Sequence, residues 1–276
     1  MLKTTSYDSV TRFDFARTLA GSGRYWTSGY LIDGMLIDTG CAYTARELVQ
    51  ALADMPLLRI VNTHAHEDHI GANGPLQRQR SHLEILAHPA ALPILADPRG
   101  TQPLHPYRQV FWGMPEPSRA EPVADGAIIE TEHHRFQVIY TPGHSLDHLC
   151  LYEPEHGWLF TGDLFVGGKE RALRDDYDIW QIIASLKRIA ALPATRLFPG
   201  SARVRDGPAQ AQAEKIAYLE QLGERVLELD KRGKSVSEIV RALLGGPMLV
   251  ELLTLGYFSR KWLVCSYLRA NNREVI

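Results

Sequence analysis

The sequence predicts a mixed α/β protein that ends in an all-helical segment, and two observations support this prediction. Between residues 10 and 198, strand-like runs rich in β-branched and aromatic residues alternate with runs of helical periodicity. After Pro208 the pattern is helical, and Ser235 with Glu238 has the spacing of a capping box. We therefore expect one domain over residues 1–207 and a helical C-terminal extension over residues 208–276.

The individual elements follow from local patterns. Residues 10–16 and 25–32 are strand-like, and Asp33-Gly34 is a hairpin dipeptide that leads into a strand at 35–37. Apolar spacing predicts a helix over 43–55, which Pro56 ends. Six prolines between residues 97 and 122 indicate an irregular loop, and so long a loop is usually functional. The remaining expected elements are strands at 57–61, 81–87, 136–141, 149–152, 158–160 and 196–198, and helices at 177–191, 209–232 and within 249–269.

Composition excludes several classes of protein. The 30 basic and 32 acidic residues give a net charge of −2, and 45% of residues are hydrophobic, which disfavours disordered and strongly basic proteins. The three cysteines, at positions 41, 150 and 265, have no CxxC spacing, so neither a disulfide framework nor a thiolate metal site is expected. No stretch has the length of a signal peptide or a membrane span. We expect a cytoplasmic protein without a membrane partner, a nucleic-acid partner is disfavoured, and a homodimer stays open.

The most informative segment is Asn62-Thr63-His64-Ala65-His66-Glu67-Asp68-His69, which follows an apolar strand. In an extended segment alternate residues share a face, so His64, His66 and Asp68 converge and a turn redirects His69. A solvated polar loop is the alternative, but three histidines and an aspartate in six positions favour a metal site. The spacing differs from HExxH, so a zincin is excluded.

Two later strands also end in potential ligands. The strand at 136–141 runs into Pro142-Gly143-His144, and the strand at 158–160 runs into Thr161-Gly162-Asp163. Proline and glycine favour sharp turns and close backbone approach before each ligand. Together with the first segment, His144 and Asp163 become candidate ligands.

These motifs, in this order, resemble the metallo-β-lactamase superfamily: HxHxDH at 64–69, TPGH at 141–144 and a following GD at 162–163. The resemblance covers about residues 25–201 and includes the strand-end segment around Asp38. It implies a four-layer αβ/βα sandwich of two mixed sheets flanked by helices. It also implies one or two Zn²⁺ ions as cofactor, or Fe or Mn ions in their place. It implies these ligands: His64, His66 and His144 for one metal, Asp68 and His69 for a second, and Asp163 as the bridge.

The chain departs from the family at Ser201, where a histidine of a PGH segment usually completes the second metal site. A serine hydroxyl is a poor metal ligand. The second metal is therefore expected to be weak, completed by water or by another residue such as His88 or His105, or absent.

The resemblance implies an enzyme, a metal-dependent hydrolase that cleaves an ester or thioester of a small, anionic molecule by means of an activated water. In this hypothesis Asp68 has a catalytic role and orients the water. His148 is a further catalytic candidate that acts from behind the metal ligands, with simple packing as the alternative. The helical extension is expected to help form the substrate pocket.

Other functions remain open at this stage. One alternative is an oxidoreductase that resembles persulfide dioxygenases, with a single iron on His64, His144 and Asp163. Others are a phosphodiesterase-like or ribonuclease-like hydrolase, and a non-enzymatic binding module. The basic residues Lys169, Arg171 and Arg174 can attract an anion or form a solvated face. The aromatic residues of the proline-rich loop can wall a pocket or pack on the core.

Overall fold

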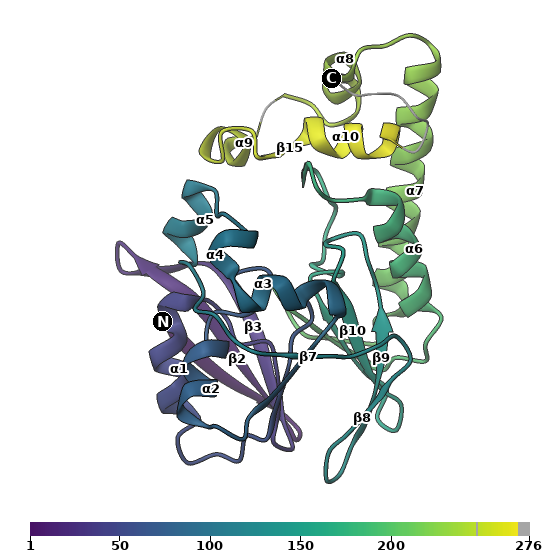
Figure 1. Ribbon diagram of the computed structural model, residues 1–276. Coiled ribbons are helices and arrows are strands. Elements are labelled where there is room, and N and C mark those ends of the chain that lie inside the picture. The colour runs from purple at the N-terminus through teal and green to yellow at the C-terminus, as the bar shows by residue number, and fades with distance from the viewer. Residues whose placement is uncertain (247, 270–276) are drawn as a thin grey trace. The chain divides into compact units, whose positions relative to one another are not determined.

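The first of two compact units contains two β-sheets, and most of their strands are the purple-to-teal arrows in Figure 1. The computed structural model describes residues 1–246 and 248–269. The first unit comprises Met1–Tyr140, Asp147–Val166 and Ala194–Asp206. The second comprises Thr141–Leu146, Gly167–Pro193 and the chain from Gly207 on.

The first sheet has seven strands and is mixed. Its first four strands pair antiparallel, and the pairs from β4 to β7 are parallel. In spatial order the strands are β1 (Leu2–Tyr7), β2 (Val10–Leu19), β3 (Ser22–Ile32), β4 (Met35–Ile37), β5 (Arg59–Val61), β6 (Glu84–Ala87) and β7 (Glu121–Pro122).

The second sheet has six strands and is also mixed. Only β11 and β13 pair in parallel, and the other neighbours are antiparallel. In spatial order the strands are β14 (Arg205–Asp206), β13 (Arg196–Pro199), β11 (Trp158–Gly162), β10 (Leu149–Glu153), β9 (Arg135–Tyr140) and β8 (Ile128–Glu130).

The main core lies between the two sheets. Tyr30 of the first sheet contacts Phe160 and Phe198 of the second edge-on, with ring centroids 5.5 and 5.4 Å apart. The Tyr30 hydroxyl also donates a 2.6 Å hydrogen bond to the carbonyl of Pro199. Burial of these aromatic side chains is a large favourable contribution to folding.

A second apolar cluster covers the other face of the first sheet. Leu48 of α1 (Ala45–Ala51) and Leu76 of α2 (Asn73–Gln79) pack there against Leu36 and Ile60 of the sheet. The first unit is therefore a sandwich of two sheets with helices on an outer face.

The proline-rich segment differs from expectation, because it contains regular structure. Two short helices lie in this segment, α4 (Pro98–Thr101) and α5 (Pro106–Phe111), and α3 (Leu92–Ala96) lies just before it. Each has a proline in its first turn. A proline is tolerated at that position because its missing N–H would have no partner within the helix. The prediction of an irregular loop over 97–122 was wrong in this respect.

The second unit is mostly helical. Asp178 caps α6 by accepting hydrogen bonds from the backbone N–H groups of Trp180 and Gln181, and the Ser235–Glu238 capping box is present. The strands β12 (Leu173–Arg174) and β15 (Phe258–Ser259) pair antiparallel. The helices are α6 (Ile179–Ala190), α7 (Ala209–Lys231), α8 (Val236–Leu243), α9 (Leu249–Leu253) and α10 (Arg260–Arg269).

The expected fold class is confirmed: two mixed sheets with helices, followed by C-terminal helices. The second unit also takes in residues 141–146 and 167–193, and a domain boundary after residue 207 stays a prediction. Within residues 1–246 and 248–269, no helix combines the length and apolar character that crossing a bilayer needs.

Candidate metal centre

Polar side chains gather in the first unit where β4, β5 and β11 end. Ligand atoms of His64, His69 and Asp163 all lie within 4.8 Å of one another. The Nε2 atom of His64 is also 2.9 Å from Nδ1 of His66. We call the set His64, His66, Asp68, His69 and Asp163 the strand-end centre.

His69 is oriented toward the carboxylates of this centre. Its Nδ1 lies 2.8 Å from Oδ2 of Asp38. Its Nε2 is buried, has no hydrogen-bond partner in the described part of the chain, and lies 3.6 Å from Asp163 Oδ2 and 3.9 Å from Asp68 Oδ2. An imidazole held by a carboxylate on one nitrogen and unpartnered on the other is typical of a metal ligand.

Asp38, which was not among the predicted metal ligands, contacts His69 of the strand-end centre. Its carboxylate accepts hydrogen bonds from the backbone N–H of Thr63 at 2.8 Å and the Thr63 hydroxyl at 2.7 Å, in addition to the contact with His69. The backbone of Asp38 has a φ of 59°, which is uncommon for a residue other than glycine. Its position directly after an apolar strand was the available signal.

Asp163 is held by two neighbours. The hydroxyl of Ser201 donates to its Oδ1 at 2.8 Å, and its backbone N–H donates to Nε2 of His148 at 3.2 Å. Gly162 has a φ of 46°, and a Cβ there would lie 2.7 Å from both His148 Nε2 and Thr63 Oγ1. These contacts support a positioning role for His148 and a new role for Ser201, which holds the carboxylate.

His144 belongs to the second unit. Its Nε2 lies 3.4 Å from the hydroxyl of Tyr177, and the two ring centroids are 4.5 Å apart. Gly143, with a φ of 128°, brings the turn so close to α6 that a Cβ would be 2.4 Å from the backbone nitrogen of Ile182. Ser185 of α6 donates a 2.8 Å hydrogen bond to the carbonyl of Pro142.

The alternative second-site ligands, His88 and His105, make contacts of their own. His88 accepts a hydrogen bond from the N–H of Ala90 through Nδ1, and its ring stacks on Tyr140 at 4.5 Å. His105 precedes α5, and its ring centroid is 5.2 Å from that of Tyr107. Among the described residues, neither histidine joins a group of three ligand atoms within 4.8 Å.

The charges of the centre favour a cation. Burial, with help from Glu67 and Asp163 and against the effect of His69, raises the pKa of Asp68 to about 7. Burial lowers the pKa of His69, but Asp163, Asp38 and Asp68 outweigh it and raise that pKa well above its usual value. Without a metal, Asp68 and His69 thus keep their protons to higher pH than free side chains do, and a divalent cation fits in place of those protons.

The motif residue Glu67 is tied to the proline-rich segment. Its buried carboxylate accepts a 2.6 Å hydrogen bond from Nε of Arg108 in α5 and forms a second contact with Nη2. Near this helix, Phe111 lies 4.5 Å from Tyr25 between ring centroids, and Trp112 lies 6.1 Å from Tyr25. The aromatic residues therefore form a cluster with one another on the loop and the β2–β3 hairpin.

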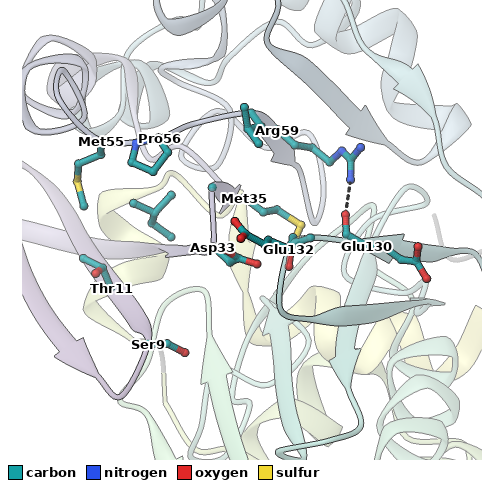
Figure 2. A pocket seen from close by; sticks show the side chains of 13 residues that line it. Ser9, Thr11, Asp33, Met35, Met55, Pro56, Arg59, Glu130 and Glu132 are labelled. Atoms are coloured by element: carbon teal, nitrogen blue, oxygen red, sulfur yellow. Dashed lines mark hydrogen bonds between the residues drawn. The ribbon is translucent and has the colours of Figure 1, made fainter.

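The cavity in Figure 2 is separate from the strand-end centre. It has a volume of about 350 Å³ and is lined by the turns before β4, β5 and β9, including Asp33, Leu58 and Glu132. The strand-end centre instead follows the last residues of β4, β5 and β11. The two sites therefore occupy opposite ends of the sheets.

The sequence profile of the metallo-beta-lactamase superfamily matches residues 27–201, so the chain belongs to this superfamily. The hydroxyacylglutathione hydrolase of Ectopseudomonas mendocina (strain ymp) is 33% identical over 165 residues, which cover 59% of this chain and 54% of that protein. The atrochrysone carboxyl ACP thioesterase of Aspergillus fumigatus is 28% identical over 186 residues, 66% of this chain and 51% of that protein. The chain thus spans about half the length of these curated relatives.

A solved structure shows the same fold. It is that of a metallo-beta-lactamase family protein from Thermus thermophilus, with 20% identity and a TM-score of 0.70. The match covers 96% of this chain and 94% of the other. The arrangement of sheets and helices in this chain is therefore that of a known fold.

Proposed function

We propose that this protein is a metal-dependent hydrolase that cleaves an ester or thioester bond of a small molecule. The observation that carries the proposal is the buried Nε2 of His69, which has no hydrogen-bond partner among the described residues and lies near the carboxylates of Asp68 and Asp163. The names of the two relatives, a hydroxyacylglutathione hydrolase and an acyl-carrier thioesterase, support hydrolysis and favour a thioester.

The proposed ligands follow the superfamily motifs. His64, His66 and His144 hold one ion, Asp68 and His69 hold a second, and Asp163 serves both. The geometry within the first unit supports His64, His69 and Asp163 as one group, and His144 enters through its TPGH motif. Imidazole and carboxylate ligands suit Zn²⁺, Fe²⁺ and Mn²⁺.

A divalent ion in this site supplies Lewis-acid chemistry and a water whose pKa is lowered toward about 7. The residues of the chain do the rest. Asp38 fixes the ring of His69 through Nδ1, while His148 and Ser201 hold the backbone and the carboxylate of Asp163. Asp68 would orient the attacking water.

The anionic character of the substrate stays a prediction. Of the three cations that suggested it, Lys169 stands 5.1 Å above the ring of Tyr218 and Arg174 forms a 2.5 Å contact with Asp176. Both cations therefore have partners within the second unit. Substrate selection by the helical extension and a homodimer likewise remain predictions.

Metal analysis with a substrate panel tests the proposal. The purified protein should contain at least one transition metal and hydrolyse thioesters faster than lactones or phosphodiesters. His64→Ala should lower turnover by at least about 10³-fold and reduce the metal content. His82→Ala, which changes an exposed histidine on the turn before β6, should leave both unchanged.

Two results would contradict the proposal. Full activity and metal content in His64→Ala would remove the strand-end centre from the mechanism. One iron per chain, with consumption of oxygen and a persulfide, would favour the dioxygenase alternative, in which His64, His144 and Asp163 hold the metal. The hydrogen bond between Ser201 and Asp163 is consistent with this alternative, because a hydroxyl that contacts a proposed ligand stands where the family usually has a histidine.

A further inference from the structure

A second group of potential ligands lies at the opposite end of the second sheet. His134 immediately precedes β9, Glu153 ends β10, and His156 lies in the turn between β10 and β11. One ligand atom from each lies within 4.8 Å of the other two. We call these three residues the turn cluster. Because β11 separates His156 from Asp163, this cluster lies about 20 Å from the strand-end centre at ~3.3 Å per residue.

The backbone already holds the three residues in place. The N–H of His134 donates to the hydroxyl of Thr131 at 3.1 Å, and its carbonyl accepts from the N–H of Thr131 at 2.9 Å. The carbonyl of His156 accepts a 2.6 Å hydrogen bond from the hydroxyl of Thr195. Glu153 pairs with Trp158 in the antiparallel ladder. The side chains therefore converge without any change of fold.

The carboxylate of Glu153 is almost fully buried, with 1% of its side chain exposed. Its Oε2 accepts hydrogen bonds from the N–H of His156 at 2.8 Å and is 3.0 Å from Nδ1 of the same residue. Buried carboxylates are commonly paired with a positive charge or bound to a metal ion. The strand end supplies no lysine or arginine within ion-pair distance of Glu153 among the described residues.

His134 leaves one polar atom unused. Its side chain is 8% exposed, and its buried Nδ1 has no hydrogen-bond partner in the described part of the chain. This Nδ1 is 3.8 Å from Oε1 of Glu153, which is beyond the 2.7–3.2 Å range of such hydrogen bonds. A direct ion pair between the two side chains would bring these atoms closer together. A cation bound between them accounts for the observed separation.

We propose that His134, Glu153 and His156 form a second metal site, which binds a divalent transition-metal ion of the Zn²⁺ type and clamps two neighbouring hairpin turns. Tetrahedral ligands about 2.0 to 2.1 Å from such an ion lie ~3.3 Å apart. The observed separations of 3.0 and 3.8 Å bracket this value, so side-chain adjustments of a few tenths of an ångström suffice.

The surroundings suit a cation that arrives from solvent. A surface depression of about 630 Å³ beside the cluster is lined by four glutamates and one arginine: Glu130, Glu132, Glu153, Glu155 and Arg135. The side chain of His156 is 43% exposed, which leaves room for water as a fourth ligand. Two imidazoles and one carboxylate prefer transition metals to Ca²⁺ or Mg²⁺, which take mainly oxygen ligands.

Counting bound Zn²⁺ tests this site independently of any activity. The full-length protein is stripped with a chelator and dialysed against Zn²⁺, and the bound metal is measured by mass spectrometry. Wild type should bind one more ion per chain than His156→Ala or Glu153→Gln, or bind that ion at least about 10-fold more tightly. His64→Ala should keep this extra ion, since it changes only the strand-end centre.

His82→Ala is the matched control, because His82 is also exposed but joins no group of ligand atoms among the described residues. It should bind as wild type does. Thermal unfolding of metal-free His156→Ala checks that this partly exposed substitution leaves the fold intact. The proposal is overturned if His156→Ala and Glu153→Gln bind as many Zn²⁺ ions as wild type with unchanged affinity. That result would leave the proposed hydrolase untouched.

Discussion

The two histidine and carboxylate groups of the first unit use the same ligand types but orient them differently. In the strand-end centre, Asp38 reaches His69 and Thr63, which lie 31 and 25 residues away in the chain. In the turn cluster, Thr131 fixes the backbone of His134 only three residues away. Long-range buried contacts thus orient the ligands of the strand-end centre, and local turns hold the backbone of the ligands in the turn cluster.

The difference has an energetic consequence. A buried polar network destabilises the fold when one member is removed, because its partners lose their hydrogen bonds without gaining water. A partly exposed turn residue can be replaced at little cost. We therefore expect substitutions around the strand-end centre to change both stability and metal binding, and substitution of the partly exposed His156 in the turn cluster to change metal binding alone.

The largest effect is expected at Arg108. Arg108→Ala leaves the carboxylate of Glu67 buried without a cation and should lower the free energy of unfolding by about 3 to 5 kcal/mol. The matched control is Arg78→Ala, which removes an exposed pair with Glu116 and should cost ~0 to 1 kcal/mol. Urea unfolding of both variants checks the difference, and equal losses would contradict it.

The next effect concerns the residue behind His69. Asp38→Asn replaces the acceptor of three hydrogen bonds with a side chain that also carries donors, so His69 loses its fixed orientation. Metal affinity of the strand-end centre should fall by about 10- to 100-fold. Asp33→Asn, at the far end of the sheets, should leave this affinity unchanged. Competition with a chromogenic chelator measures both variants, and an unchanged affinity in Asp38→Asn would refute the orienting role.

Ser201 offers two substitutions with opposite expected signs. Ser201→Ala removes the hydrogen bond to Asp163 and should weaken the more labile metal by up to ~10-fold. Ser201→His supplies a nitrogen ligand at the same turn and should tighten that metal by about 10- to 100-fold. Metal loss against chelator concentration gives both values. Simultaneous loss of two metals from wild type would show that another residue already completes the site.

A further effect is a pH slope in the metal-free protein. The pKa values of Asp68 and His69 are raised in the folded state, so the folded chain holds more protons than the unfolded chain. Stability should therefore fall as the pH rises from about 4 through 7, where Asp68 titrates, and fall further as His69 loses its proton. Asp68→Asn should reduce this slope. Melting temperatures between pH 5 and 8 in chelator decide it, and an equal slope in the variant would contradict the assignment to Asp68.

Strands with a clear apolar pattern were predictable from the sequence, and the mostly polar strand β1 was not. The strand at 35–37 has the observed bounds of β4, and β9, β10 and β13 lie within one or two residues of expectation. The edge strand β1 was missed because Leu2–Tyr7 is mostly exposed and lacks apolar alternation. The expected helix within 249–269 is interrupted between α9 and α10, where Leu255 has a φ of 52° and β15 pairs with β12.

The site was predictable only as far as ligand spacing reaches. Consecutive motifs identify His64, His66 and His69, because the backbone alone decides which neighbours share a face. The partners Asp38 and Arg108 come from distant segments, and no local pattern shows that they meet the motif. The turn cluster was not predicted for the same reason, since its members come from two separate hairpins.

The ion pair between Glu67 and Arg108 has a consequence for how this protein can change its specificity. The position between His66 and Asp68 is nominally variable in the motif, yet here its charge is matched to a residue 41 positions downstream. Exchange of the proline-rich loop for that of a relative should therefore succeed only when the donor brings its own cation, or when Glu67 is neutralised in the same step. Among homologues, these two positions should covary, and the loop should be inherited together with the motif it contacts.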